Sequence, residues 1–373
     1  MKSTPRLIAF YLPQYHPIKE NDEWWGKGFT EWTNVAKAKP LFPNHYQPHI
    51  PSDLGFYDLR VPETRTHQAD LAKQHGVESF CYYHYWFAGK ELLERPFKEV
   101  LQTGEPDFGF CICWANQTWS GIWHGCPDRI LIEQTYPGEE DHRKHFDSLL
   151  PAFLDKRYTR IDGMPIFIIF RPQEIPDSRK TTDLWRKMAV DAGLKGLYFI
   201  GIHENPYWNP QDHGYDASIT PKLPPRNRPW ISRRQPIKWL KQKYEESRGI
   251  PKIYEYKNIY PELLVNSDIN RNFINYPCII PNWDNTPRSG AYGMVFHESS
   301  PSLFRLHFKE ALKLTQNAAN DNRLIFIKAW NEWAEGNYLE PDMRFGLEYL
   351  EVIRDELSEI QRFQYQLITL FDP

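Results

Sequence analysis

The stretch "LIFIKAWNEWAEG", residues 324–336, changes character in its middle. Its first half is an apolar run of the kind that forms a buried strand. Its second half places two tryptophans, two glutamates and an asparagine within the eight positions 329–336. Carboxylates between indole rings cost free energy in a core unless they are paired or solvated. The stretch therefore predicts a buried strand whose carboxyl end leaves the core.

Seven further apolar runs of similar length precede this one. They are nearly continuous in apolar residues rather than alternating, which is typical of parallel strands that are covered on both faces. The run at 216–222 is the least apolar, and a loop there would make the sheet irregular. The eight expected strands lie at 6–12, 79–86, 108–116, 165–170, 197–204, 216–222, 277–283 and 324–330.

Amphipathic stretches separate most of these runs, and their ends carry helix signals. Pro62 suits the first helical position, and Gly76 and Gly193 suit the position just past a helix end. The expected helices cover 62–76, 139–156, 181–193, 303–318 and 346–363. Strands that alternate with helices eight times predict an α/β fold, a single (β/α)8 TIM-type barrel over residues 1–373. A doubly wound sheet is the competing fold, but no GxGxxG or Walker-type loop follows any strand.

Two segments interrupt the alternation. Residues 13–61 form a long first βα loop, and residues 222–276 form an insertion before the seventh strand. Within the insertion, residues 222–257 hold eleven Lys or Arg against three Glu, a net charge of +8. The segment "PIKWLKQKYEES" (236–247) predicts a short helix with Trp239 and Leu240 docked on the barrel. A solvated basic loop is one interpretation; a site for anionic glycan, pyrophosphate-linked glycan or a membrane surface is the other.

The composition is that of a globular protein with a large core. The 373 residues are 41% hydrophobic and 25% charged, with a net charge of −3. The first residues do not resemble a signal peptide, and no run approaches the ~18 apolar residues of a membrane span. We therefore expect a soluble, cytoplasmic protein. Five cysteines without paired CxxC spacing predict buried reduced thiols rather than disulfides or a zinc site.

Aromatic residues make up 15% of the chain, and many stand beside hydrogen-bonding residues rather than among aliphatics. Rings flanked by polar groups suit a sugar, which has apolar C–H faces and many hydroxyls. In a TIM-type barrel the active site is built at the carboxyl ends of the strands, where this sequence repeatedly turns polar and aromatic. The predicted substrate-binding residues are Tyr11, Gln14, Glu31, Trp32, His84, Trp86, Trp114, Asn116, Arg171, His203, Asn282, Trp283, Asn331 and Trp333.

Glu332 and Glu335 are the predicted catalytic residues. A helical or tight turn places residues three apart on one side, so both carboxylates can face the same space. Two carboxyl groups, one protonated and one ionised, are the usual equipment for cleaving or forming glycosidic bonds. A surface turn with two solvated glutamates is the plainer interpretation. The chain has no GxSxG elbow, HExxH box or Asp-x-Asp, so we expect no metal, no cofactor and no nucleic-acid partner.

The sequence also resembles a known family. The matching segments are "AFYLPQYHP", "GFTEWTNV", "HYQPHIPSDLGFYDL", "CYYHYWFAGKELLERPF", "CWANQTW", "ILIEQTYPG", "IPNWDNTPR" and "KAWNEWAEGNYLEP". Together they resemble the WbsX-like family, also described as glycoside hydrolase family 99-like, from residue 6 to about 341. The resemblance implies an endo-α-mannosidase-type barrel linked to O-antigen and capsule polysaccharides. It also implies that Glu332 is a base toward the sugar 2-hydroxyl, giving a 1,2-anhydro intermediate, and that Glu335 protonates the leaving oxygen.

One position departs from the family pattern. Many relatives have Glu where "CWANQTW" has Gln117, so the substrate or the activity can differ here. Three functions follow from the sequence: a glycoside hydrolase or transglycosylase acting on a bacterial surface polysaccharide, a glycosyltransferase using an activated donor, and a glycan-binding protein without catalysis. In each, the partner is an oligosaccharide or polysaccharide.

Overall fold

The computed structural model describes residues 4–121, 126–224, 236–265 and 272–371. Its main sheet is a parallel barrel, with strands in the order β12-β10-β9-β8-β4-β2-β1-β15-β13. The strands are β1 (Arg6–Tyr11), β2 (Ser79–Phe87), β4 (Gly109–Trp114), β8 (Met164–Ile169), β9 (Tyr198–Ile202), β10 (Ala217–Ile219), β12 (Ile274–Tyr276), β13 (Cys278–Ile279) and β15 (Leu324–Ile327).

The barrel closes through a strand that changes partner at Pro277. Before this proline, β12 pairs with β10, and after it, β13 pairs with β15. The carbonyl of Pro277 accepts a hydrogen bond from the amide of Phe326 at 2.9 Å, so pairing to β15 continues across the break. With β12 and β13 counted as one interrupted strand, the barrel has the predicted eight. The (β/α)8 prediction is confirmed, and the run at 216–222 does contain a strand.

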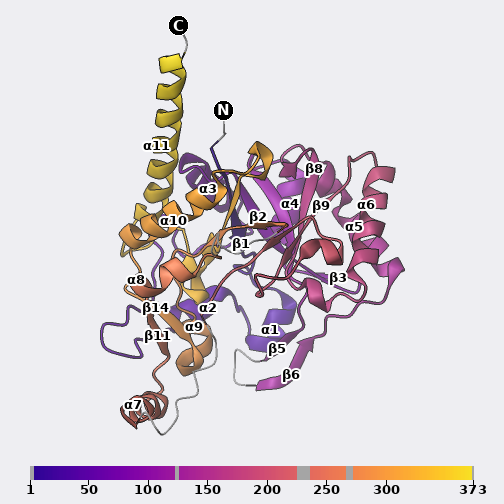
Figure 1. Cartoon of the computed structure of the whole chain (residues 1–373). Coiled ribbons are helices and arrows are strands. Elements are labelled where there is room, and N and C mark those ends of the chain that lie inside the picture. The colour runs from indigo at the N-terminus through magenta and orange to yellow at the C-terminus, as the bar shows by residue number, and fades with distance from the viewer. Residues whose placement is uncertain (1–3, 122–125, 225–235, 266–271, 372–373) are drawn as a thin grey trace.

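Helices cover the outside of the barrel, with α5 and α6 on one side and α10 and the lower part of α11 on another (Figure 1). Pro62 is the first residue of α3, and Gly76 and Gly193 take positive φ just after α3 and α6, as predicted. The helices are α3 (Pro62–Gln74), α4 (Arg95–Thr103), α5 (Glu139–Leu154), α6 (Ser178–Asp191), α10 (Pro301–Thr315) and α11 (Glu348–Phe371). No helix in the described ranges is long and apolar enough to span a lipid bilayer.

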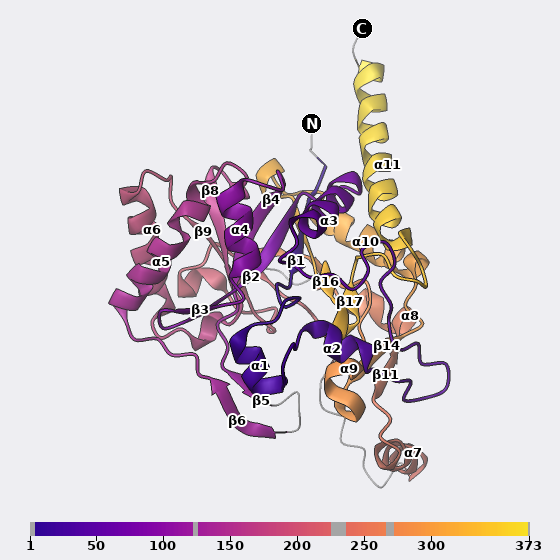
Figure 2. The same cartoon turned by 180° about the vertical axis from the view of Figure 1, so that it is seen from behind.

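Short elements gather at the carboxyl ends of the barrel strands, seen below the barrel in Figure 2. The first βα loop contributes two helices, and a hairpin and a further helix complete this end. They are α1 (Lys19–Trp25), α2 (Glu31–Ala36), α9 (Thr286–Ser289), β5 (Trp119–Gly121) and β6 (Cys126–Ile132). Two small hairpin strands, β3 (Lys90–Leu92) and β7 (Arg160–Ile161), extend β2 and β8. The long first loop therefore carries structure of its own over the mouth of the barrel.

The insertion before the seventh strand also forms structure. It holds α7 (Pro236–Ser247), β11 (Lys252–Glu255) and α8 (Tyr256–Ile259), and β11 pairs in parallel with β14 (Met294–His297). The predicted helix at 236–247 is confirmed. The prediction that Leu240 docks on the barrel is wrong, because this side chain is 59% exposed and α7 lies away from the barrel in both views (Figures 1 and 2). Trp239 is half-buried.

The core lies inside the barrel and between the barrel and its helices. The central parts of the strands are fully buried, as their unbroken apolar sequences require. Cys81, Cys111, Cys113 and Cys278 are buried free thiols, as predicted, and the side chain of Cys126 lies outside the described part. Because both faces of each strand are occupied, the rigid barrel fixes the positions of the loops at its carboxyl end.

Candidate active site

A cavity of ≈ 960 Å³ occupies the mouth of the barrel. That volume is at the upper end of the range of small-molecule sites, and it suits more than one sugar ring. Its aromatic lining includes Phe10, Trp25, Phe29, Tyr83, Tyr85, Trp119, Phe170 and Trp283. Among the described residues, its charged lining consists of four carboxylates and four cations: Glu31, Glu204, Glu332 and Glu335, with Arg171, Lys222, Arg288 and Lys328.

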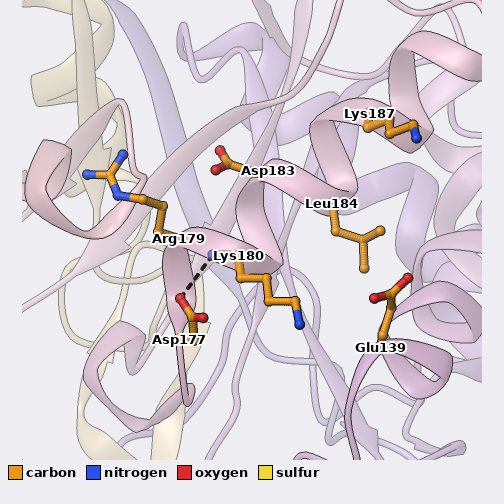
Figure 3. A pocket seen from close by; sticks show the side chains of 7 residues that line it. All are labelled: Glu139, Asp177, Arg179, Lys180, Asp183, Leu184 and Lys187. Atoms are coloured by element: carbon orange, nitrogen blue, oxygen red, sulfur yellow. Dashed lines mark hydrogen bonds between the residues drawn. The ribbon is translucent and has the colours of Figure 1, made fainter.

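A second hollow lies on the outer surface between α5 and α6 (Figure 3). It has a volume of ≈ 500 Å³, and nearly all of its lining is charged. Asp177 caps the start of α6 there by accepting from the amide of Lys180, and Leu184 is the one apolar side chain. Solvated charges on helix surfaces are ordinary, so the cavity at the barrel mouth is the candidate site.

The turn that carries Glu332 and Glu335 follows β15. Residues Asn331–Glu332 (β16) pair with Asn337–Tyr338 (β17), and Trp333–Glu335 form a single 3-10 turn between them. Gly336 closes the turn with φ +54, and a Cβ atom there would lie 2.7 Å from the amide nitrogen of Asp284. That amide donates to the carbonyl of Glu335 at 2.7 Å. The turn thus requires glycine at 336 and is pinned to the segment after β13.

Trp333 anchors the turn from behind. Its ring stacks on Tyr338 with centroids 3.8 Å apart, and its Nε1 donates to the carboxylate of Glu340 at 2.6 Å. Glu340 also accepts from Tyr57 and from Gln68. Burial raises the pKa of Glu340 to about 7, and these donors oppose the rise. With Trp333 buried in this network, both carboxylates of the turn are left facing the cavity.

Arg288 bridges the carboxylates of the site. Its Nη1 donates to Glu335 at 2.7 Å, its Nη2 to Glu332 at 3.2 Å and its Nε to Glu31 at 3.1 Å. All four side chains are at most 12% exposed. They come from α2 in the first loop, from α9 and from the turn after β15. One guanidinium with three carboxylates leaves the cluster short of positive charge, so at least one carboxyl group gains from holding a proton.

Glu332 is the carboxyl group of this cluster whose pKa is raised, so that it holds its proton more readily. Burial raises its pKa to about 7, and the neighbouring Glu335 adds to the rise, while Arg288 and Lys328 lower it. A pKa near neutral suits a group that exchanges protons with a substrate at neutral pH. The site therefore has a carboxyl group poised to gain or lose a proton.

Six of the sixteen predicted site residues line the cavity: Gln14, Glu31, Arg171, Trp283, Glu332 and Glu335. The other ten are not among the described residues of its wall, and their side chains have contacts elsewhere. They are Tyr11, Trp32, His84, Trp86, Trp114, Asn116, His203, Asn282, Asn331 and Trp333. Whether any of the sixteen binds a sugar stays a prediction.

Strand alternation explains four of the ten. Successive side chains of a strand point to opposite faces, so Tyr83 and Tyr85 face the cavity while His84 and Trp86 face α5. His84 Nε2 lies 2.8 Å from His145 Nε2, and Trp86 stacks on the same ring with centroids 4.6 Å apart.

Neighbouring strands follow the same rule. Trp114 lies edge-on to His145, with centroids 4.7 Å apart, and the Tyr11 hydroxyl donates to Gln68 on α3. These side chains join the barrel to its helices.

The remaining members of the ten hold loops in place. Asn331 exchanges two hydrogen bonds with the backbone of Leu12, and Trp32 Nε1 donates to the carbonyl of Tyr57 at 2.7 Å. Asn282 accepts from the amide of Tyr338 at 3.1 Å, and His203 stacks on Trp208. The side chain of Asn116 accepts from the amide of Arg171 and donates to its carbonyl. Trp333 anchors the turn after β15 through Glu340. Several of these groups support the wall that the other residues form.

Sequence reasoning did not select Arg288, Tyr83, Tyr85 or Lys328, which all line the cavity. Tyr83 and Tyr85 each lie next to a selected residue in β2. Because successive side chains of a strand point to opposite faces, the alternation along β2 is the signal that could have identified them. Arg288 lies on α9, past the end of the seventh strand, and only its place in "IPNWDNTPR" marked it. Among the described residues, no three His, Cys, Asp or Glu side chains are grouped to hold a metal ion.

The fold and site define a class: a (β/α)8 barrel with paired carboxylates in an aromatic-lined cavity at its mouth. The chain belongs to the WbsX family, since the model of that family, described as "Glycosyltransferase WbsX", matches residues 7–353. Two curated relatives, each an "Uncharacterized protein WxcX" from a strain of Xanthomonas campestris pv. campestris, are 36% identical over 354 residues. This match covers 94% of the chain, which spans about half the length (49%) of each relative.

Solved structures show the same fold at low identity. A "Glycoside hydrolase-like protein" aligns with a TM-score of 0.57 and 16% identity, over 95% of this chain and 94% of that one. The GH99 endo-alpha-mannosidase from Bacteroides thetaiotaomicron aligns with a TM-score of 0.54 and 14% identity, over 96% and 98%. At these identities the likeness concerns the fold alone.

Proposed function

We propose that this protein is a glycoside hydrolase or transglycosylase that acts on a bacterial surface polysaccharide, such as O-antigen or capsule, with Glu332 and Glu335 as its catalytic pair. The observation that carries the proposal is the placement of both carboxylates in one aromatic-lined cavity, joined by Arg288. Aromatic rings pack on the C–H faces of sugars, and paired carboxyl groups supply the acid and the base that the reaction needs. The cytoplasmic location expected from the sequence stays a prediction.

In the proposed reaction, Glu332 takes the proton of the sugar 2-hydroxyl, and the freed oxygen attacks the anomeric carbon. The glycosidic bond breaks as Glu335 gives its proton to the leaving oxygen, which leaves a 1,2-anhydro sugar. Glu335 then removes a proton from water, or from an acceptor hydroxyl, as that oxygen opens the ring. Glu332 returns the first proton to the 2-oxygen, so the enzyme ends as it began.

The electrostatics of the free site fit this cycle in one respect and constrain it in another. A base with a pKa of about 7 is ionised in about half of the molecules at neutral pH. Arg288 Nη1 donates a hydrogen bond to Glu335 at 2.7 Å. Glu335 can therefore reach the leaving oxygen of a bound glycan only if it exchanges this hydrogen bond for one to that oxygen.

The second candidate is a glycosyltransferase with an activated donor, which the family description favours. The two reactions differ in their need for a nucleotide sugar. Purified polysaccharide from the source strain, incubated with the protein, should be cut or rearranged without any nucleotide sugar, and the Glu332→Gln/Glu335→Gln double variant should be inactive. Product formed only with a nucleotide sugar would establish the transferase. Binding with no product under either condition would establish a glycan-binding protein.

We also propose that the basic insertion contacts an anionic surface. Its +8 charge supports this, as do Ile237, Leu240 and Tyr244, which are 82%, 59% and 60% exposed and lie at helical spacing on α7. Exposed apolar side chains beside basic ones favour a membrane with anionic lipid over a glycan. Charge reversal of Arg233 and Arg234, which lie outside the described residues, should weaken binding to anionic liposomes at low salt. Undiminished binding of the variant to anionic liposomes would refute the proposed membrane contact.

A further inference from the structure

The charges of the cavity divide into two groups on opposite sides of the barrel. Glu332 and Glu335 follow β15, and Arg171 follows β8, four places away around an eight-stranded sheet. Arg288 is occupied by the three carboxylates described above. Lys328 follows β15 directly and acts on Glu332, so it belongs to the side of the catalytic pair. Among the other described residues of the lining, two cations (Arg171 and Lys222) accompany a single carboxylate, Glu204. The part of the lining away from the catalytic pair therefore carries a net positive charge.

Arg171 is held in place by neutral groups. The side chain of fully buried Asn116 accepts from the amide of Arg171 at 2.8 Å and donates to its carbonyl at 2.9 Å, which fixes the backbone at the end of β8. The amide oxygen of Gln117, oriented toward the guanidinium, accepts from Nε at 2.8 Å and from Nη2 at 3.3 Å. An amide orients a guanidinium as a carboxylate does but leaves its charge uncompensated.

Among the described residues, Arg171 makes one ion pair, which is weak, and its charge also acts on nearby Glu174. Glu204 lies 3.5 Å from its Nη1, and the Glu204 side chain is 74% exposed, whereas that of Arg171 is 23% exposed. An ion pair of this length and exposure contributes little and is readily exchanged for a better partner. The guanidinium also lies over the ring of Phe170, at 5.6 Å from its centroid, which is a further neutral contact. The site thus presents an oriented cation to the cavity.

We propose that Arg171, oriented by Gln117, recognises an anionic substituent on the glycan, either the carboxylate of a uronic acid or a phosphate. The inference rests on the proposed action on glycans and names the substrate class. A planar guanidinium binds either oxyanion through two parallel hydrogen bonds, which is the strongest polar contact available to a protein. An acidic glycan is also steered away from Glu332 and Glu335 and toward the opposite wall, which fixes its direction in the cavity.

Three small probes test the proposal: methyl β-D-glucuronoside, methyl β-D-glucoside and glucose 6-phosphate. Their affinities for the native protein and the variants are measured by isothermal titration calorimetry, and the Arg171 Nε–H resonance of the native protein is followed in parallel. The native protein should bind the glucuronoside or the phosphate at least about tenfold more tightly than the glucoside, as expected for a charge-assisted hydrogen bond. The tighter of the two anions identifies the substituent. Equal affinity for all three probes would overturn the proposal.

Two variants locate the effect. Gln117→Glu keeps the size of the side chain but supplies a carboxylate to Arg171, so it should abolish the preference for the anions; Arg171→Met should do the same. Arg143→Met, which removes an exposed arginine paired with Glu139 on α5, is the matched control and should retain the preference. A preference that persists in both Gln117→Glu and Arg171→Met would overturn the assignment, and melting curves check that both variants fold.

The failure of this inference is separable from that of the proposed function. If an acidic polysaccharide and its carboxyl-reduced form are processed equally well, only the anion site is refuted. If no polysaccharide is processed with or without nucleotide sugar, the proposed function fails, whatever the probes show.

Discussion

Replacing Arg288 by Met should move the titration of Glu332 to higher pH. The guanidinium is the nearest cation to this carboxylate, with Nη2 3.2 Å from Oε2, and it holds the pKa of Glu332 down against burial and Glu335. Methionine fills much of the same volume without charge. The ionised form of Glu332 would then lose its main support, so the carboxyl group would keep its proton to a higher pH.

The size of the shift follows from the geometry. Two unit charges ~4 Å apart at an effective dielectric constant of ~20 interact by about 4 kcal/mol. The guanidinium charge is spread over three nitrogens, and only Nη2 contacts Glu332, so we take about a third of this, roughly 1.3 kcal/mol, for Glu332. That energy corresponds to about one pKa unit, from about 7 to about 8. If Glu332 is the base, turnover at pH 6 should fall about tenfold and recover above pH 8.

The titration can be followed without a substrate. Carboxyl ¹³C NMR of protein labelled at glutamate resolves the groups, and Glu332→Gln identifies the signal that disappears. Arg288→Lys retains a charge but not the fork and should give a smaller shift. Arg305→Met removes a surface arginine that pairs with Glu356 and should give none. A midpoint that stays near 7 in Arg288→Met would show that Arg288 does not control Glu332.

Two further predictions concern stability. The folded-state pKa of Glu332 is raised above 4.5, so the free energy of unfolding falls as pH rises from about 4.5 to about 7, and Glu340, whose pKa is also raised to about 7, adds to this slope. Glu332→Gln should remove the contribution of Glu332 to the slope and be more stable by up to about 3 kcal/mol above pH 7, measured by urea unfolding at pH 5 and pH 8. Equal slopes would refute this. Gly336→Ala should cost about 1–3 kcal/mol, because φ is +54 and the new Cβ meets the backbone of Asp284 at 2.7 Å. Gly89→Ala is the control, because Gly89 has φ +92 and nothing lies within 4 Å of the added Cβ, so it should cost only about 1 kcal/mol. Equal losses of stability in the two variants would show that the contact of residue 336 with Asp284 does not matter.

The barrel could be predicted because its strands are covered on both faces. Runs such as 6–12 and 324–330 are nearly continuous in apolar residues, and each contains a strand. The seventh strand was harder. Its expected range began at Pro277, whereas pairing starts at Ile274 and changes partner at that proline. A residue without an amide hydrogen marks such a break, but the sequence does not say that pairing resumes on the other side.

The site could be predicted only in part, because the orientation of each side chain depends on register. Histidine and tryptophan alternate with tyrosines in 82–86, and either set suits a sugar-binding face. The structure turns Tyr83 and Tyr85 inward, where the barrel has room, and packs His84 and Trp86 against His145 on α5. A helix that supplies a histidine partner 61 residues away leaves no local signal in the strand.

The most direct test of the central claim, catalysis by the Glu332 and Glu335 pair, is the dependence of Glu335→Gln on its leaving group. The measurement compares native and variant kcat/KM, which reports cleavage of the glycosidic bond and not the later ring opening, on an oligosaccharide that the native protein cleaves and on the nitrophenyl glycoside of the same sugar. Nitrophenolate leaves without a proton, so kcat/KM of the variant should fall roughly 10²-fold or more on the oligosaccharide and little on the nitrophenyl substrate. Equal losses of kcat/KM on both substrates, or a near-native value on the oligosaccharide, would contradict the assignment of Glu335 as the acid.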